Sequence, residues 1–117
     1  MKKIQWLIVF VLMVGFFASC AFHASEYYFG TYSEAEKLYH QGKYEAAIGK
    51  YQQYLNQNAQ GNTRAIAEYY IAKSYLMLEK KGEAVAQFEK IMKDYPKTSW
   101  ADFSKQQLQK LNSPEKK

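Results

Sequence analysis

The chain has few of the residue types that build metal, cofactor or catalytic sites. Its 117 residues include one cysteine, Cys20, two histidines and one arginine, Arg64. A single cysteine excludes an intramolecular disulfide and a multi-cysteine zinc site. His23 and His40 are far apart and have no metal-ligand spacing, and the sequence contains no glycine-rich phosphate loop and no nucleophile elbow. We therefore predict that the protein has no cofactor, no bound metal and no enzymatic activity.

The sequence also lacks a concentrated charge of one sign. The formal net charge is +5, and lysine is interleaved with glutamate along the chain. This mixture is typical of solvated helix surfaces, whereas nucleic-acid binding proteins gather Lys and Arg on one face. Arginine usually dominates the recognition of phosphates and bases, and it occurs once. The sequence therefore argues against a nucleic-acid partner.

Aromatic residues, in contrast, are abundant, with 11 Tyr, 7 Phe and 2 Trp. Each large aromatic side chain buries much apolar surface when it packs. This composition allows a chain of this length to form one packed domain.

The first 20 residues have the organisation of an export signal. Lys2 and Lys3 precede an apolar run from Trp6 to Phe17, and small residues then lead to Cys20. A short apolar run behind a positive end is typical of a secretory signal, and it is shorter than the roughly 20 residues of a membrane span. An uncleaved membrane anchor that extends this run is the alternative.

The segment Phe17-Ala18-Ser19-Cys20 resembles the lipobox of bacterial lipoproteins, although Phe17 stands where that family usually has leucine. The resemblance implies cleavage before Cys20 and acylation of Cys20 with palmitate-like chains. Several acyl chains on one residue give stable membrane attachment, because each buried methylene contributes about 0.8 kcal/mol. Ala21 follows Cys20, which in enteric-type sorting implies the outer membrane, facing the periplasm. The inner membrane is the alternative.

The rest of the chain is predicted to be helical throughout, so the fold class is all-α. Apolar residues recur at three- and four-residue spacings in the segments 33–40, 44–55, 63–78, 83–95 and 100–111. The turns are predicted at Gly42, around Gly61 and at residues 79–82, and Pro96 is predicted to end the fourth helix. Capping-box patterns that begin at Ser33 and Ser99 predict the starts of the first and fifth helices.

An internal repeat relates the first two helical segments to the next two at an offset of 37 residues. The aligned pairs are Ala35 with Ala72, Leu38 with Tyr75, Ala47 with Ala84, Tyr51 with Phe88, and Tyr54 with Ile91. Small residues let the helices of a hairpin approach closely, and bulky residues fill the space between hairpins. This repeat and the stretch 42–48 resemble the tetratricopeptide repeat (TPR), whose period is about 34 residues. The resemblance implies an α-solenoid of two TPR hairpins with a C-terminal capping helix.

These observations divide the chain into four predicted regions. They are a lipoprotein signal peptide at 1–19, a lipidated N-terminus and linker at 20–32, a TPR domain with its capping helix at 33–111, and a disordered tail at 112–117.

In TPR proteins the first helix of each repeat lines an inner groove that binds a partner protein. The resemblance places the following residues in such a groove, with Ile66 and Gln107 beside them: Tyr32, Glu36, Tyr39, His40, Tyr69, Lys73, Leu76, Met77 and Phe103. Tyr and Met are enriched at protein interfaces, and such a groove accepts an extended peptide or a helix. The alternative is that several of these aromatic residues simply pack the short array.

The Tyr-Pro-x-x-Ser segment at 95–99 further resembles the BamD-like lipoproteins of outer-membrane protein assembly and the YbgF/CpoB-like TPR proteins of the cell envelope. The resemblance implies a membrane-tethered adaptor for protein–protein interactions in the bacterial envelope. Two alternatives stay open. One is a scaffold that associates with itself, and the other is an accessory subunit of a peptidoglycan or other envelope enzyme.

Overall fold

The computed structural model describes residues 2–5, 30–57 and 59–114. Its described helices are 2–5, 30–40, α2 (Tyr44–Asn56), α3 (Asn62–Met77), α4 (Lys81–Asp94) and α5 (Ser99–Asn112), and the described part of the chain contains no strand. The all-α prediction is therefore confirmed. The chain divides into two compact units, Met1–Gly30 and Thr31–Lys117, and the longer helices belong to the second.

The predicted signal peptide lies almost entirely outside the described residues, and so does the predicted lipidation site Cys20. Within residues 2–5, 30–57 and 59–114, no helix combines the length and the apolar character that a membrane crossing requires.

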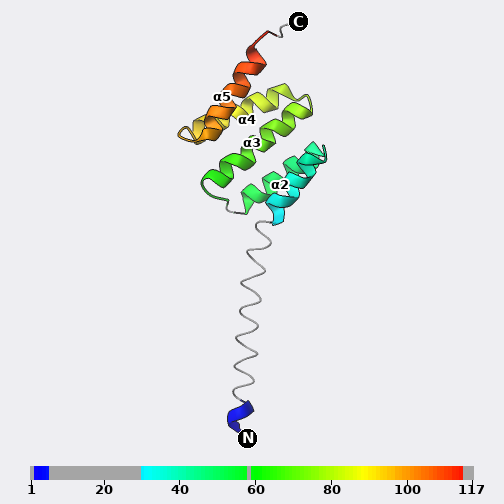
Figure 1. Cartoon of the computed structure of the whole chain (residues 1–117), viewed down its shortest axis with the longest axis vertical. Coiled ribbons are helices and arrows are strands. Elements are labelled where there is room, and N and C mark those ends of the chain that lie inside the picture. The colour runs from blue at the N-terminus through cyan, green and yellow to red at the C-terminus, as the bar shows by residue number, and fades with distance from the viewer. Residues whose placement is uncertain (1, 6–29, 58, 115–117) are drawn as a thin grey trace. The chain divides into compact units, whose positions relative to one another are not determined.

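The helices of the second unit pack side by side in chain order (Figure 1). The 30–40 helix contacts α2 through a 2.7 Å ion pair between Glu34 and Lys50 and through the rings of Tyr32 and Tyr51. The next contacts join α2 to α3, α3 to α4, and α4 to α5. Two helical hairpins therefore stack and α5 covers the second, which confirms the predicted α-solenoid with a capping helix.

Small residues on two sides of α3 explain its central position. Ala65, Ala67, Ala72 and Ser74 are all completely buried. With 3.6 residues per turn, Ala65 and Ala72 fall on one flank of α3, and Ala67 and Ser74 fall on the other. Where these small side chains lie, the neighbouring helices can approach α3 closely. On one flank Ala72 joins Phe88 and other α4 residues in a buried apolar cluster.

The two hairpins are equivalent residue by residue, as the repeat predicted. Four of the five aligned pairs are buried to the same degree, and the fifth pair, Leu38 and Tyr75, is half-buried in both hairpins. The four buried pairs are Ala35 and Ala72 at 0%, Ala47 and Ala84 at 0%, Tyr51 and Phe88 at 0%, and Tyr54 at 2% with Ile91 at 0% exposure. The turns match as well. The amide of Lys43 donates to the carbonyl of Leu38 at 2.9 Å, and the amide of Lys80 donates to that of Tyr75 at 2.9 Å.

The structure corrects the predicted second turn. The residue equivalent to Gly42 (φ +75°) is Glu79, with φ +59°, and Gly82 lies inside α4. Gly42 and Glu79 both occupy the left-handed position that ends a helix in the Schellman arrangement. The repeat register, and not the nearest glycine, therefore sets the turn.

The structure also corrects the predicted starts of the first and fifth helices. The first helix already includes residue 30, where the linker was predicted, so Ser33 lies within it. The N-cap of α5 is Thr98, whose side chain accepts from the amide of Ala101 at 3.3 Å, and not Ser99. In contrast, α4 ends just before Pro96, as predicted.

Replacing Glu79 by glycine should raise the free energy of unfolding by about 1 kcal/mol, because glycine adopts positive φ without the steric cost of other residues. The matched control is Glu83→Gly in the first turn of α4, which should lower it by up to about 1 kcal/mol. Urea denaturation followed by circular dichroism measures both changes. A Glu79→Gly protein that is no more stable than the parent would contradict this account of the turn.

Candidate functional site

Aromatic side chains from three helices form a continuous row, which we call the aromatic strip. It consists of Tyr39 from the 30–40 helix, Tyr69 and Tyr70 from α3, and Trp100 and Phe103 from α5. The ring centroids of Tyr39 and Tyr70 are 5.1 Å apart, and Tyr69 lies 6.0 Å from Tyr70, 5.3 Å from Trp100 and 6.3 Å from Phe103. Several of these contacts are edge-on, an arrangement that aromatic pairs prefer. The strip therefore links both hairpins to the capping helix.

Several residues predicted to bind a partner belong to this strip or border it. Tyr39, Tyr69 and Phe103 are part of the strip, and the ring of His40 lies 5.7 Å from that of Tyr39. Gln107 hydrogen-bonds the hydroxyl of Tyr69, while burial raises the pKa of this tyrosine. Tyr70 was not among the predicted partner-binding residues, although its ring joins the two hairpins within the strip.

Two further predicted positions extend the surface along α3. Lys73 and Met77 follow Tyr69 at four-residue spacings, which places the three side chains on one side of the helix. Met77 is 53% exposed and Phe103 is 42% exposed. This part of the surface therefore presents apolar groups to solvent, and Lys73 lies on the same side of α3 as Met77.

The remaining predicted positions are tied to the core. The ring of Tyr32 packs on the buried rings of Tyr51 and Tyr54, at 5.7 Å and 5.2 Å. Burial, together with the charge of the hydrogen-bonded Glu36, raises the pKa of Tyr32 far above its usual value. Leu76 packs against the apolar cluster between α3 and α4. Tyr32 and Leu76 thus contribute to packing, which is the role that the alternative interpretation gave to some of these residues.

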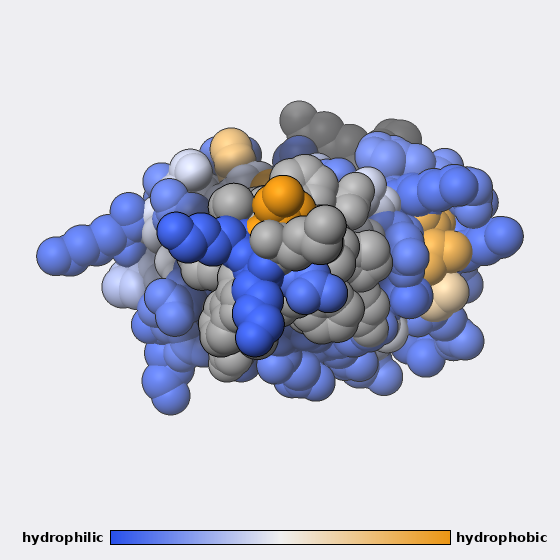
Figure 2. All heavy atoms as spheres, turned by 90° about the horizontal axis from the view of Figure 1, so that it is seen from below, coloured by the Kyte–Doolittle hydropathy of each residue, from blue (hydrophilic) through white to orange (hydrophobic). Residues whose placement is uncertain are grey.

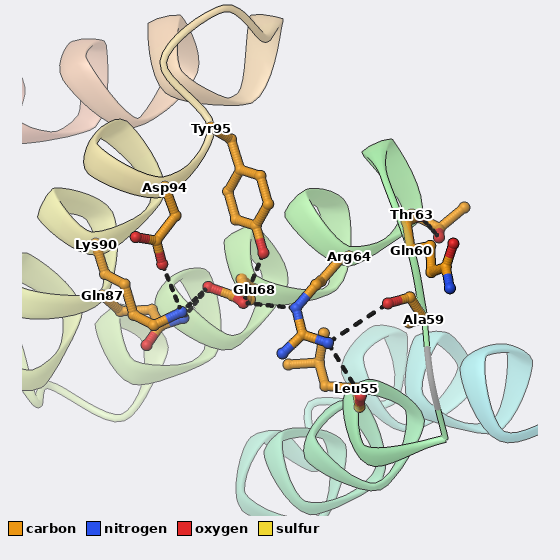
Figure 3. Close-up of polar contacts among 10 residues, drawn as sticks. All are labelled: Leu55, Ala59, Gln60, Thr63, Arg64, Glu68, Gln87, Lys90, Asp94 and Tyr95. Carbon is orange, nitrogen blue, oxygen red and sulfur yellow. Dashed lines mark hydrogen bonds and ion pairs between the residues drawn. The ribbon is translucent and has the colours of Figure 1, made fainter.

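The opposite side of α3 carries a polar cluster centred on Glu68 (Figure 3), which is 1% exposed. Its carboxylate accepts from Lys90 at 2.6 Å, from the Tyr95 hydroxyl at 3.1 Å and from Gln87 at 3.4 Å, and it lies 3.7 Å from the Nε atom of Arg64. A buried charge is costly unless it is paired and hydrogen-bonded, so these four partners are what allow its burial.

The prediction that the glutamates occupy solvated outer faces is therefore wrong for Glu68. A signal for its burial was present in the sequence. Glu68 stands three residues before Ile71 and seven before Tyr75, on the side of the helix where apolar residues recur.

An open pocket of about 220 Å³ lies beside this cluster, between α2, α3 and α4. Its lining consists of Gln52, Leu55, Asn56, Arg64, Glu68, Ile71, Tyr75, Gln87 and Lys90. At roughly 100° of rotation per residue, Arg64 and Glu68 point about 180° away from Lys73 and Met77. The helix α3 thus presents two chemically different surfaces on opposite sides. Within the described residues, no group of three His, Cys, Asp or Glu side chains is placed to hold a metal ion.

Comparison with known proteins identifies the second hairpin. Residues 67–98 match the tetratricopeptide repeat family. The match supports the interpretation of the second hairpin as a tetratricopeptide repeat. The match covers most of α3, all of α4 and the segment up to Thr98, which agrees with the second repeat as the sequence predicted it. No curated protein and no solved structure matches the chain significantly. TPR hairpins generally mediate protein–protein binding and typically serve as non-catalytic adaptors.

Two tyrosines of the helical hairpins differ in how their hydroxyls are satisfied. The hydroxyl of Tyr95 donates to Glu68, whereas the fully buried hydroxyl of Tyr51 has no hydrogen-bond partner among the described residues. Burial raises the pKa of both groups, and for Tyr95 the Glu68 charge adds to this effect. An unsatisfied buried hydroxyl costs free energy that a hydrogen-bonded one does not.

We expect Tyr51→Phe to raise the free energy of unfolding at pH 7 by about 1 kcal/mol, because it removes an unpaired buried hydroxyl. The matched change Tyr95→Phe should lower it by about 1–2 kcal/mol, because it removes a hydrogen bond to a carboxylate. Urea midpoints at pH 7 compare the two variants, and a loss of stability in Tyr51→Phe would refute the interpretation.

The Tyr51→Phe variant also tests how the free energy of unfolding depends on pH. The raised pKa means that folding holds the Tyr51 proton more tightly than the unfolded chain, whose tyrosines ionise near pH 10. The contribution of the protonated Tyr51 to the free energy of unfolding is therefore complete below about pH 10, and it is lost as the pH rises above that value. Urea midpoints from pH 8 to 11 should therefore fall more steeply for the parent than for Tyr51→Phe.

Proposed function

We propose that this protein is a membrane-tethered adaptor that binds a protein partner of the bacterial cell envelope along the aromatic strip. The observation that carries the proposal is where the exposed apolar side chains lie. Among the described residues, the exposed large hydrophobic side chains are Ile4, Met77 and Phe103, and the last two are predicted partner-binding positions. On the face shown in Figure 2, hydrophilic residues dominate the described surface, so exposed apolar groups are scarce there.

The chemistry of the surface fits a partner with apolar or aromatic side chains. Tyr and Trp provide large contact areas at low cost in side-chain entropy, and exposed apolar groups with a polar rim are typical of interaction sites. Helices hold the strip in place, so little ordering is needed when a partner binds. An extended peptide and an amphipathic helix both fit this mode of recognition.

The membrane tether is inferred from the lipobox-like sequence that ends at Cys20. Acylation would confine the adaptor to a membrane surface and raise its effective concentration towards partners there. The residue after Cys20 supports the outer membrane as the location, and outer-membrane protein assembly is the process that the resemblance favours.

A photocrosslinking amino acid in place of Met77, introduced into cells that express the full chain, tests the partner site. We expect one discrete adduct with an envelope protein, reduced at least about tenfold by Phe103→Asp, because a charge in the strip opposes apolar burial. The control Gln106→Asp makes a similar change at an exposed site of the same helix and should leave the adduct intact. An adduct unaffected by Phe103→Asp would contradict the proposal, and an adduct of two copies of this chain would replace the adaptor with a self-associating scaffold.

The intact mass of the protein from its native membrane tests the tether. We expect a chain that begins at an acylated Cys20, and we expect Cys20→Ala to abolish both the cleavage and the acyl mass. A full-length, unmodified chain would rule out the lipoprotein and would favour the uncleaved anchor.

A further inference from the structure

We propose that the pocket between α2, α3 and α4 is a second binding site, which takes a carboxylate through Arg64. This site lies on the side of α3 opposite to Lys73 and Met77, so it does not depend on the function proposed for the aromatic strip. Its volume of about 220 Å³ far exceeds the roughly 30 Å³ share of one water molecule. A carboxylate with a stem of a few carbon atoms therefore fits.

Arg64 is held in position to receive an anion. Its Nη1 atom donates to the carbonyls of Leu55 at 3.2 Å and Ala59 at 3.4 Å, and its Nε atom lies 3.7 Å from Glu68. Its Nη2 atom has no hydrogen bond to any described residue, and the side chain is 41% exposed. A guanidinium fixed through two of its nitrogens loses little freedom when the third binds a ligand, and its planar shape matches a carboxylate.

The chain places its single arginine here, although 15 of its 16 basic residues are lysines. A lysine ammonium has three donors on one atom, so it could not hold two backbone carbonyls and a carboxylate and still present a donor on a separate nitrogen. The residue type therefore agrees with a bridging and binding role at this position.

The charge of the pocket favours a monoanion. Arg64 and Lys90 contribute two positive charges to the lining and Glu68 one negative charge, which leaves a net charge of +1. Lys90 is already shared between Glu68 at 2.6 Å and Asp94 at 3.2 Å, so Arg64 is the principal donor available. A doubly charged phosphate would leave excess negative charge near the buried Glu68, whereas one carboxylate would balance the lining.

The other walls suit a short carbon stem with polar ends. Leu55, Ile71 and Tyr75 supply apolar and aromatic contacts, and the amides of Gln52, Asn56 and Gln87 supply additional donors. A carboxylate of this kind has two sources, a free small acid or the acidic side chain of a docked protein. The chemistry of recognition is the same for both.

The single arginine provides a direct assay. In the ¹⁵N-labelled full chain in detergent micelles, one arginine Nε–Hε NMR signal belongs to Arg64. We expect butyrate to shift this signal saturably, with an affinity on the order of millimolar for so small a ligand. Its neutral analogue butyramide should leave the signal unmoved, and inorganic phosphate should bind more weakly than butyrate.

A matched pair of variants separates the pocket from a general effect of charge. Gln52→Glu adds a carboxylate to the exposed rim of the pocket and should weaken butyrate binding about fivefold, as expected for one like charge at close range in a hydrated site. Gln106→Glu makes the same change at an exposed position of α5 and should leave the affinity unchanged. Both variants retain Arg64, so the same signal reports on both.

Capped peptides distinguish the two sources. A shift by acetyl-Ala-Glu-Ala-amide, but not by its glutamine counterpart, would support a protein side chain as the ligand, whereas a shift by butyrate alone would support a free acid. The proposal is overturned if neither carboxylate shifts the signal saturably, if butyramide acts like butyrate, if Gln106→Glu weakens binding as much as Gln52→Glu, or if phosphate binds more tightly than butyrate.

Discussion

The close approach of α3 to both of its neighbours is the constraint on which the rest of the structure depends. Small, completely buried side chains lie on two flanks of α3, including Ala65, Ala72, Ala67 and Ser74. Because these two flanks are committed to packing, the other two sides of the helix remain for different purposes. One side carries Tyr69 and the aromatic strip, and the other carries the polar cluster and its pocket. A bulky residue on either flank would separate the hairpins and disturb both surfaces, since protein interiors tolerate little added volume.

The buried carboxylate of Glu68 links these two surfaces through the capping helix. It accepts from Tyr95, which directly follows α4, and the carbonyl of Tyr95 in turn accepts from the amide of Thr98 at 3.2 Å and from its hydroxyl at 2.8 Å. Thr98 caps α5, and α5 carries Trp100 and Phe103 to the aromatic strip. The position of the capping helix thus depends on a charge on the far side of α3. Removing one partner of such a buried pair costs more stability than the intact pair provides.

Much of the fold could be predicted from the sequence, because close helix packing requires small residues at fixed spacings wherever it occurs. Ala35 and Ala72 therefore revealed the repeat and with it the order of the hairpins. The second turn was predicted less well, because Glu79 adopts a conformation that composition associates with glycine. The burial of Glu68 was missed for a different reason. Its position on the apolar side of the helix is visible in the sequence, but its partners in α4 and beyond lie 19 to 27 residues away, and no local pattern shows that they converge to satisfy a buried charge. Within the strip, the TPR resemblance supplied Tyr39, Tyr69 and Phe103, whereas the bridging position of Tyr70 depends on how the two hairpins meet.

The two sides of α3 differ in the physics of recognition as well as in composition. Binding along the aromatic strip would draw on buried apolar area, which depends little on salt, whereas a carboxylate at Arg64 would draw on charge, which salt screens. Coupling between two sites requires an element with two arrangements that both ligands bias. The tightly packed flanks of α3 give the helix one arrangement, and the arginine is already held by two carbonyls and a carboxylate before any ligand arrives. The architecture therefore favours two faces that bind independently, which agrees with the adaptor function proposed for the protein.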